Sequence, residues 1–219
     1  MQFYSQSKED HILYEKYFKN YNLEGQKYYF EMGAMDGVIY SNTKFYEDTL
    51  GWTGILVEPN PITFYNLIKN RPNNKLMNVI CSNLKNSLEF NISVDIPAVC
   101  SLEVTKPKDF DAQYYNHSNM LKIKSIPVSL DTILENSGIP RVDFCIIDVE
   151  GHEVHVLESC SFKFPVVLFL IEFLEDEEKN NKVISIMQTN NYKFMEKCAH
   201  NGVFINNDYL KYFNLITPF

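Results

Sequence analysis

Short, nearly continuous apolar runs alternate with amphipathic stretches along most of the chain. Continuous apolar runs are typical of parallel strands that are buried on both faces. They predict five such strands, over residues 27–32, 54–58, 75–81, 142–148 and 165–171. Apolar positions at helical spacing lie before and between these runs. They predict helices over residues 5–21, 42–50, 60–71, 129–135 and 176–190, with a further helix that starts near residue 153.

The alternation of strands and helices favours a doubly wound, mostly parallel α/β sheet of the Rossmann-like kind, in a single domain that covers residues 1–219. Two strands around residues 192–195 and 202–205 predict an antiparallel hairpin at the sheet edge. Residues 86–126 depart from the alternation, because exposed-strand patterns at each end enclose a stretch rich in prolines and charges. We interpret this region as a β-rich lid inserted between strands three and four, since long loops in compact domains are commonly functional.

The first predicted strand runs into a glycine-containing loop, Glu31-Met32-Gly33-Ala34-Met35-Asp36-Gly37. Glycines let the backbone approach a ligand closely, and nucleotide-like cofactors bind at the carboxyl edge of a parallel sheet. The middle glycine of the dinucleotide fingerprint is replaced here by Met35, and Asp36 would repel a pyrophosphate. A carboxylate suits the sulfonium and ammonium groups of S-adenosylmethionine (SAM), so the loop favours that cofactor. A plain tight turn is the alternative interpretation.

Glu58 ends the second predicted strand, and an acid about 20 residues after such a loop commonly binds a ribose diol. A carboxylate has acceptor oxygens for both hydroxyls. Ser82 and Asn83 follow the third strand, where a polar side chain can meet the edge of a nucleobase. An ordinary turn at the end of a strand explains these two residues equally well.

The densest polar cluster follows the fourth strand and reads Asp148-Val149-Glu150-Gly151-His152-Glu153. Glu172 ends the fifth strand in the same way. The carboxyl ends of parallel strands meet at one edge of the sheet, so we expect four acids on a common rim: Glu31, Glu58, Asp148 and Glu172.

Composition limits the partners and the location. The formal net charge of −8 argues against a long nucleic acid as partner, because phosphates are bound by clustered Lys and Arg. Five cysteines without CxxC spacing, and no signal-peptide pattern, indicate a reduced, cytoplasmic protein without a zinc site. No apolar run reaches the roughly 18 residues of a membrane span. A small or neutral substrate fits this charge better, and we expect a monomer or homodimer.

Together these motifs resemble the FkbM family of SAM-dependent methyltransferases, which have the class I methyltransferase fold. The matching segments are Ser5-Gln6 with Glu9-Asp10; Glu31-x-Gly33-Ala34-x-Asp36-Gly37; Ser41-Asn42-Thr43; Gly51-Trp52-x-Gly54-Ile55-Leu56-x-Glu58-Pro59-Asn60; Ser129-Leu130-Asp131; and Ile147-Asp148-Val149-Glu150-Gly151-x-Glu153. One departure is Ile146, a position where family members often carry a lysine. If that lysine contributes to the chemistry, activity here is in question or relies on other groups.

The resemblance implies transfer of a methyl group from SAM to an oxygen, often a hydroxyl of a sugar or small metabolite. It implies that Glu31 and the loop glycines hold the methionine end of SAM, that Glu58 holds the ribose, and that Ser82 or Asn83 lies near adenine. The full set of expected cofactor contacts is Glu31, Gly33, Ala34, Asp36, Gly37, Ser41, Asn42, Glu58, Pro59, Ser82, Asn83 and Asp148.

Methyl transfer to a hydroxyl releases one proton, and we expect Asp148 to take it, with Glu150 or His152 as substitutes. A second hypothesis places Mg²⁺ between Asp148 and Glu172, since oxygen ligands suit this ion and it would lower the pKa of the acceptor hydroxyl.

Two alternative functions are compatible with the same residues. In a metal-dependent glycosyltransferase, Asp148-x-Glu150 would bind the cation of a sugar diphosphate. In a catalytically degenerate methyltransferase domain, the fold would serve as an interaction module, and Ile146 favours this alternative. SAM binding without turnover would indicate the module.

Overall fold

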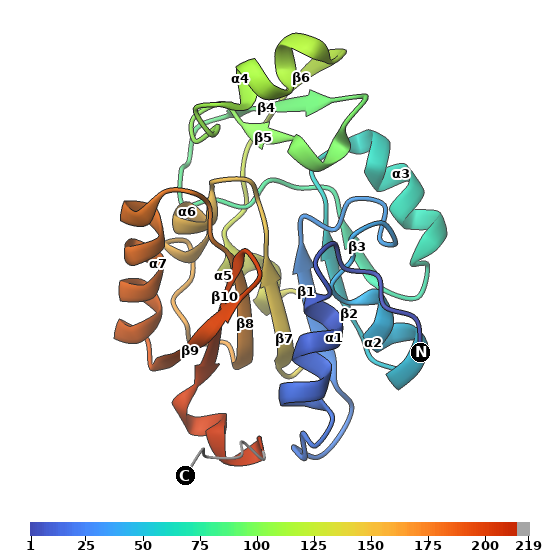
Figure 1. The fold of residues 1–219 in the computed structure, drawn as a ribbon, viewed down its shortest axis with the longest axis vertical. Helices are drawn as coiled ribbons and strands as arrows, with labels where there is room; N and C mark the ends of the chain where they lie inside the picture. Colours follow the sequence, from blue (N-terminus) through green and yellow to red (C-terminus); the bar gives the residue numbers. More distant parts are fainter. Residues whose placement is uncertain (214–219) are drawn as a thin grey trace.

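A seven-stranded sheet forms the centre of the molecule (Figure 1). The computed structural model describes residues 1–213; residues 214–219, the end of the expected domain, lie outside the described part. The strands lie in the order β3-β2-β1-β7-β8-β10-β9. Their bounds are β1 Tyr28–Met32, β2 Thr53–Val57, β3 Lys75–Met77, β7 Val142–Ile147, β8 Val166–Glu172, β9 Tyr192–Cys198 and β10 Asn201–Asn206.

The first five strands of this sheet are parallel. Only β10 runs in the opposite direction, because it is antiparallel to both of its neighbours, β8 and β9. The prediction of a mostly parallel, doubly wound sheet with an antiparallel edge hairpin is therefore confirmed. The strand order reverses between β1 and β7, which creates a crevice at their carboxyl ends.

Helices cover both faces of the sheet, and each face has its own apolar core. The helices are α1 Glu9–Leu13, η1 Tyr14–Phe18, α2 Lys44–Leu50, α3 Pro61–Asn70, α5 Leu130–Glu135, α6 Glu153–Leu157, α7 Glu177–Thr189 and η4 Asn207–Tyr212. Apolar side chains of α5, α6 and α7 pack on one face, and those of α1, η1, α2 and α3 pack on the other. Among residues 1–213, no helix combines the length and apolar character needed to cross a membrane.

The N-terminal helix is shorter than the predicted range 5–21. It consists of α1 and the π-helical turn η1, so it spans residues 9–18. The carboxylate of Asp10 accepts bonds from the Tyr4 N–H at 2.6 Å and the Ser5 hydroxyl at 2.7 Å. These bonds hold the preceding residues against the first turn, so the segment before residue 9 does not continue the helix.

The third strand also ends earlier than predicted, at Met77 instead of residue 81. The side-chain amide of Asn78 donates to the carbonyl oxygens of Glu58 at 2.8 Å and Pro59 at 3.0 Å. This contact turns the chain along the end of β2, and the sheet pairing stops. Cys81 then makes only an isolated bridge with Val128.

The segment between β3 and β7 folds into a second, three-stranded sheet at one end of the main sheet (Figure 1). The expected strands are present as β4 Leu88–Ser93 and β6 Met120–Ser125, which pair antiparallel. The elements between them were not predicted: η2 Pro97–Val99, β5 Ser101–Leu102, α4 Phe110–Gln113 and η3 Tyr115–His117. A small apolar core that includes Leu88, Phe90, Ile92 and Leu102 supports this sheet.

Arg71, at the end of α3, is fully buried and connects four parts of the fold. Its guanidinium pairs with Glu47 of α2. It also donates to the Gly37 carbonyl at 2.8 Å, to the Tyr29 hydroxyl at 2.7 Å and to the Thr43 hydroxyl at 3.1 Å. A buried cation with this many partners fixes the relative positions of β1, α2, α3 and the loop after β1.

Replacement of Arg71 by Met should lower the free energy of unfolding by about 3–5 kcal/mol, because it leaves buried acidic and hydroxyl partners without their donor. Chemical denaturation measures this change. The control is Lys85→Met, at an exposed lysine, which should change stability by less than about 0.5 kcal/mol. A loss at Arg71 as small as that of the control would contradict the structural role of this network.

Candidate functional site

The crevice between β1 and β7 is formed by two loops in direct contact. Gly33 follows β1 with φ of 83°, and a Cβ atom on it would lie 2.0 Å from the carbonyl oxygen of Asp148. The Asp148 N–H in turn donates to the Met32 carbonyl at 3.3 Å. Only glycine fits at position 33, because any side chain would separate the two loops.

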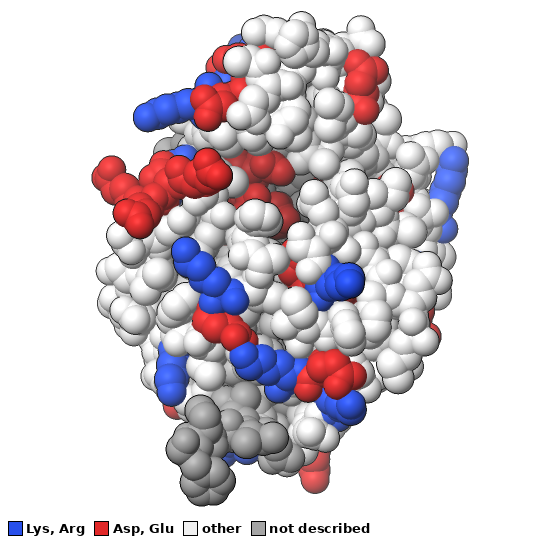
Figure 2. All heavy atoms as spheres, viewed as in Figure 1, with Lys and Arg blue, Asp and Glu red and all other residues white. Residues whose placement is uncertain are grey.

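A cavity that is open to solvent lies at this crevice. Concave sites of this kind commonly bind small molecules. One side is formed by the loop after β1 and by Glu58 and Pro59, and the opposite side by residues 148–152. The small sheet contributes Phe90 and Leu102. Figure 2 shows acidic atoms gathered in a hollow beneath the part of the molecule that holds this small sheet.

Glu58 lies in the wall of this cavity, as the sequence predicts for a cofactor contact, and is only 5% exposed. Its carboxylate accepts the N–H groups of Met35 at 2.8 Å and Asn60 at 2.7 Å. Burial raises its pKa from 4.5 to about 7, although these two bonds oppose the rise. Each carboxylate oxygen keeps a further acceptor site, so Glu58 can still bind hydroxyls of a ligand.

Glu31 does not reach the cavity, which differs from the expectation that it holds the methionine end of SAM. Its carboxylate accepts the Ser41 hydroxyl at 2.9 Å, the Asn42 N–H at 2.6 Å and the Thr43 hydroxyl at 2.6 Å. Burial raises its pKa, and the nearby Arg71 opposes that rise. The side chain therefore organises the start of α2, and Ser41 and Asn42 are used in that contact.

Of the other residues predicted to contact the cofactor, some line the cavity and some make contacts only within the protein. Gly33 and Pro59 line the cavity. Asp36 accepts the N–H groups of Val38 and Ile39 within its own turn. Gly37 faces Arg71, whose Cγ would lie 2.6 Å from an added Cβ, and Ala34 is buried in the core. The two loop glycines therefore differ in role. Gly33 lines the cavity, whereas Gly37 leaves room for the side chain of Arg71 to pack against the loop.

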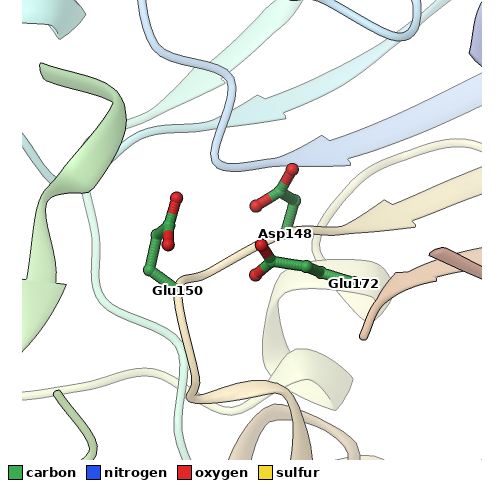
Figure 3. A group of neighbouring side chains, drawn as sticks. All are labelled: Asp148, Glu150 and Glu172. Carbon is green, nitrogen blue, oxygen red and sulfur yellow. The ribbon is translucent and has the colours of Figure 1, made fainter. Parts of the chain in front are cut away.

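Asp148, Glu150 and Glu172 form a cluster at the opposite wall, with one carboxylate oxygen from each within 4.8 Å of the others. Figure 3 shows the three carboxyl groups around a common space. Burial, together with the neighbouring carboxylates, raises the pKa of Asp148 to about 7 and that of Glu150 to about 9. Asp148 and Glu150 line the cavity, and Glu172 lies at the end of β8.

The loop after β7 is bent so that both of its acids reach this cluster. Glu150 and Gly151 both have positive φ, 54° and 98°, and such strain in a non-glycine residue is often found at functional sites. The buried carboxylate of Glu153 accepts the N–H groups of Val149 at 3.2 Å and Gly151 at 3.1 Å, which holds the bend. The sequence pattern contained Glu153, but this bracing role was not predicted.

His152 connects the small sheet with the main sheet and is 1% exposed. Its two ring nitrogens contact the hydroxyls of Thr105 and Ser82, each at 2.9 Å. Burial lowers its pKa to about 3, so the ring is neutral. Ser82 therefore lies behind His152, and Asn83 bonds His155 and Glu158 instead of the cavity. Neither residue lines the cavity, in contrast to their predicted place near adenine.

Several cavity residues were not predicted from the sequence. They are Gln6, Met32, Met35, Tyr40, Val79, Ile80, Cys81, Phe90, Pro97, Ala98, Cys100, Leu102 and Val149. Most are apolar and come from the small sheet or from the segment after β3. Alternation in residues 88–94 indicated a strand, but only the tertiary fold turns Phe90 toward the cavity.

Ile146 is fully buried in the core between the sheet and the N-terminal helices. It does not line the cavity. Where family members often carry a lysine, this chain therefore has an apolar side chain that packs in the core. The charged groups on this side of the site come instead from the residues that follow β7.

Comparisons with known proteins identify one sequence family and several solved structures. Residues 31–194 match the sequence profile of the methyltransferase FkbM domain. A search of curated proteins finds no significant match. Similar solved structures include a putative RNA methyltransferase from Pyrococcus horikoshii (12% identity, TM-score 0.48, 91% of this chain and 80% of that chain). Others are precorrin-6y C5,15-methyltransferase from Geobacter metallireducens (10%, 0.45, 85% and 81%) and the N-terminal domain of human METTL16 with SAH (14%, 0.40, 82% and 60%).

Glu58 should make the stability of the protein depend on pH. Its folded pKa of about 7 exceeds the ordinary 4.5, so the folded state keeps a proton that the unfolded chain releases, and stability falls as pH rises between these values. The difference corresponds to about 3 kcal/mol. In chemical denaturation, the wild type should lose about that much more stability than Glu58→Gln from about pH 4.5 to about pH 8. Equal losses in the two proteins would refute the assignment.

Proposed function

The chain belongs to the FkbM methyltransferase domain family, and on this basis we propose that it is a SAM-dependent O-methyltransferase. The acceptor is a hydroxyl group of a sugar, a glycan or a small metabolite. The observation that carries this proposal is the position of Glu58 in the wall of a cavity at the β1–β7 crevice. A carboxylate at this position suits a ribose, and the opposite wall offers a group that can take a proton.

The residues present fit the parts of SAM. Gly33 allows the donor to lie close to the backbone, and Glu58 with Pro59 suits the ribose. Apolar side chains of Val79, Ile80 and Cys81 line the same cavity and provide a surface for adenine. Acidic groups nearby complement the positive charge of the methionine part. Bound SAM supplies an electrophilic methyl group, so the chain must align the acceptor and accept its proton.

Asp148 suits the role of proton acceptor better than its neighbours. Its pKa of about 7 keeps a substantial fraction of the carboxylate ionised near neutral pH, which is favourable for a general base. Glu150, with a pKa of about 9, remains largely protonated there. Both ring nitrogens of His152 already contact hydroxyl groups. The base is therefore Asp148, and His152 is a positioning residue.

The acidic residues of the cavity wall also limit the charge that the acceptor can carry. Asp148 and Glu150 lie in the cavity lining, so an anionic acceptor would be repelled, whereas a neutral polyol finds carboxylate oxygens for its hydroxyls. The glycosyltransferase alternative receives no support from the family match. The interaction-module alternative is separated from an enzyme by turnover, because it predicts SAM binding without methyl transfer.

Glu58→Gln should weaken SAM binding at least about tenfold, since hydrogen bonds to a charged acceptor each contribute roughly 1.5–3 kcal/mol. Isothermal titration calorimetry with SAM measures the change. Glu135→Gln, at an exposed acid of α5, is the matched control and should bind like the wild type. Equal affinities of wild type and Glu58→Gln would remove Glu58 from the cofactor site, and no binding by the wild type would overturn the proposed function.

Asp148→Asn should lower kcat by about 10²–10⁴-fold, the usual contribution of a general base, while it leaves SAM affinity within a few-fold. Transfer of labelled methyl groups from SAM to a panel of glycans and hydroxylated metabolites, with amines for comparison, identifies the acceptor and measures the rates. Asp208→Asn, an exposed acid of η4, is the control. Unchanged kcat in Asp148→Asn would show that another group takes the proton.

A further inference from the structure

The acidic cluster at the cavity wall lacks a cationic partner from the chain itself. Within residues 1–213, none of Asp148, Glu150 and Glu172 forms a salt bridge. Lys179 reaches the neighbouring loop but donates to the Gly151 carbonyl at 3.4 Å. Three partly buried carboxyl groups around one space (Figure 3) therefore have no cationic side chain of the described residues to stabilise them.

A buried acceptor oxygen without a donor adjoins this space. The Oδ1 atom of Asn201 is buried and has no hydrogen-bond partner among the described residues, and the buried Oε2 atom of Glu172 has only the neighbouring carboxyl groups of Asp148 and Glu153 beside it. Asn201 is 6% exposed and is the register partner of Glu172 on β10, so the two side chains leave the sheet on the same face, side by side. A buried acceptor without a donor is rare and calls for an explanation, of which a bound ion is one.

We propose that Asp148, Glu150, Glu172 and Asn201 form a binding site for one divalent cation of the Mg²⁺, Mn²⁺ or Ca²⁺ kind. All four candidate ligands offer oxygen, which these hard cations prefer over nitrogen or sulfur ligands. Asp148 and Glu150 face the cavity, and Glu172 with Asn201 forms the side next to β10. A cation held here keeps coordination positions open toward the cavity.

The spacing of the carboxylate oxygens is compatible with such an ion. They lie within 4.8 Å of one another. Three oxygens no more than 4.8 Å apart leave a central point at most about 2.8 Å from each of them. Bonds from oxygen to Ca²⁺ are about 2.3–2.6 Å long and those to Mg²⁺ about 2.0–2.1 Å, so the side chains have to close by less than about 1 Å for either ion.

The role of this cation rests on the proposed O-methyl transfer, whereas the site itself does not. A hydroxyl of the acceptor that binds the cation from the cavity side becomes more acidic. Its proton passes to the carboxylate oxygen of Asp148 that is not bound to the cation. The acceptor oxygen then forms its bond to the methyl carbon, and the electron pair of the broken carbon–sulfur bond stays on sulfur.

The site is tested with Mn²⁺ alone, on the full chain after removal of metals with EDTA and dialysis. Loss of the electron paramagnetic resonance signal of free Mn²⁺ measures binding. We expect one ion per chain, weakened about tenfold or more in Glu172→Gln and in Asn201→Ala. Glu175→Gln, at an exposed acid close in sequence, should bind like the wild type. Mg²⁺ and Ca²⁺ should each compete for the same site.

Thermal unfolding keeps the test independent of activity and of any folding defect in one variant. Saturating Mg²⁺ or Ca²⁺ should raise the Tm of the wild type, because a ligand that binds only the folded state stabilises it. The same ions should raise the Tm of Glu172→Gln less. In EDTA, Glu172→Gln should have a Tm close to that of the wild type, since the amide replaces a carboxyl group that has no cationic partner among the described residues. A Tm in EDTA well below that of the wild type would show that Glu172 stabilises the fold without a cation and would contradict its role as a cation ligand.

Two results would overturn the site: no Mn²⁺ binding by the wild type, or equal binding by the wild type, Glu172→Gln and Asn201→Ala. The proposed function fails separately. A chain that binds Mn²⁺ at this site but does not bind SAM refutes SAM-dependent methyl transfer and retains the cation site. Full methyl transfer in the presence of EDTA refutes the role assigned to the cation.

Discussion

The carboxylate of Glu31 accepts three bonds from the first residues before α2, and the buried Arg71 stands next to it. Glu31 is the next-to-last residue of β1, and Arg71 directly follows α3 and also binds the loop carbonyl of Gly37. These contacts fix where the chain turns after β1. Because that turn is fixed, Gly33 lies against Asp148 without a side chain between them, and the crevice has its shape before any ligand binds.

The same contacts divide the buried acids of the molecule into two groups. Glu31 has donors for its oxygens and a cation nearby, so its charge is compensated inside the fold. Asp148, Glu150 and Glu172 lie around a shared space without such partners among the described residues, and burial raises the pKa of each. A buried carboxylate whose charge is balanced by donors and a cation of the protein has a structural role. Carboxylates that the fold leaves uncompensated are available to a ligand, a proton or a cation, so the proposed chemistry belongs at the β7–β8 side.

The fold was predictable from the sequence because its signals are local. Apolar runs marked the strands, and acids at their ends marked one rim of the sheet. The direction of each acidic side chain was not predictable in this way. Glu31 and Glu58 have the same local pattern, yet Glu31 turns to Ser41 and Thr43, whereas Glu58 faces the cavity. The insertion was also only partly predicted, since β5 is two residues long and depends on pairing with β4.

The small sheet contributes to the site through a single buried histidine and a set of apolar contacts. His152 follows the loop that carries Asp148 and Glu150, and it contacts Thr105 in the insertion and Ser82 in the segment after β3. With a pKa of about 3, this ring stays neutral, so the connection does not change with pH in the physiological range. The insertion is thereby held next to Asp148 and Glu150, and its residues Phe90 and Leu102 line the cavity. In the proposed methyltransferase, the parallel sheet supplies the general features of the donor site, and we propose that selectivity for one acceptor arises where this insertion meets the acids.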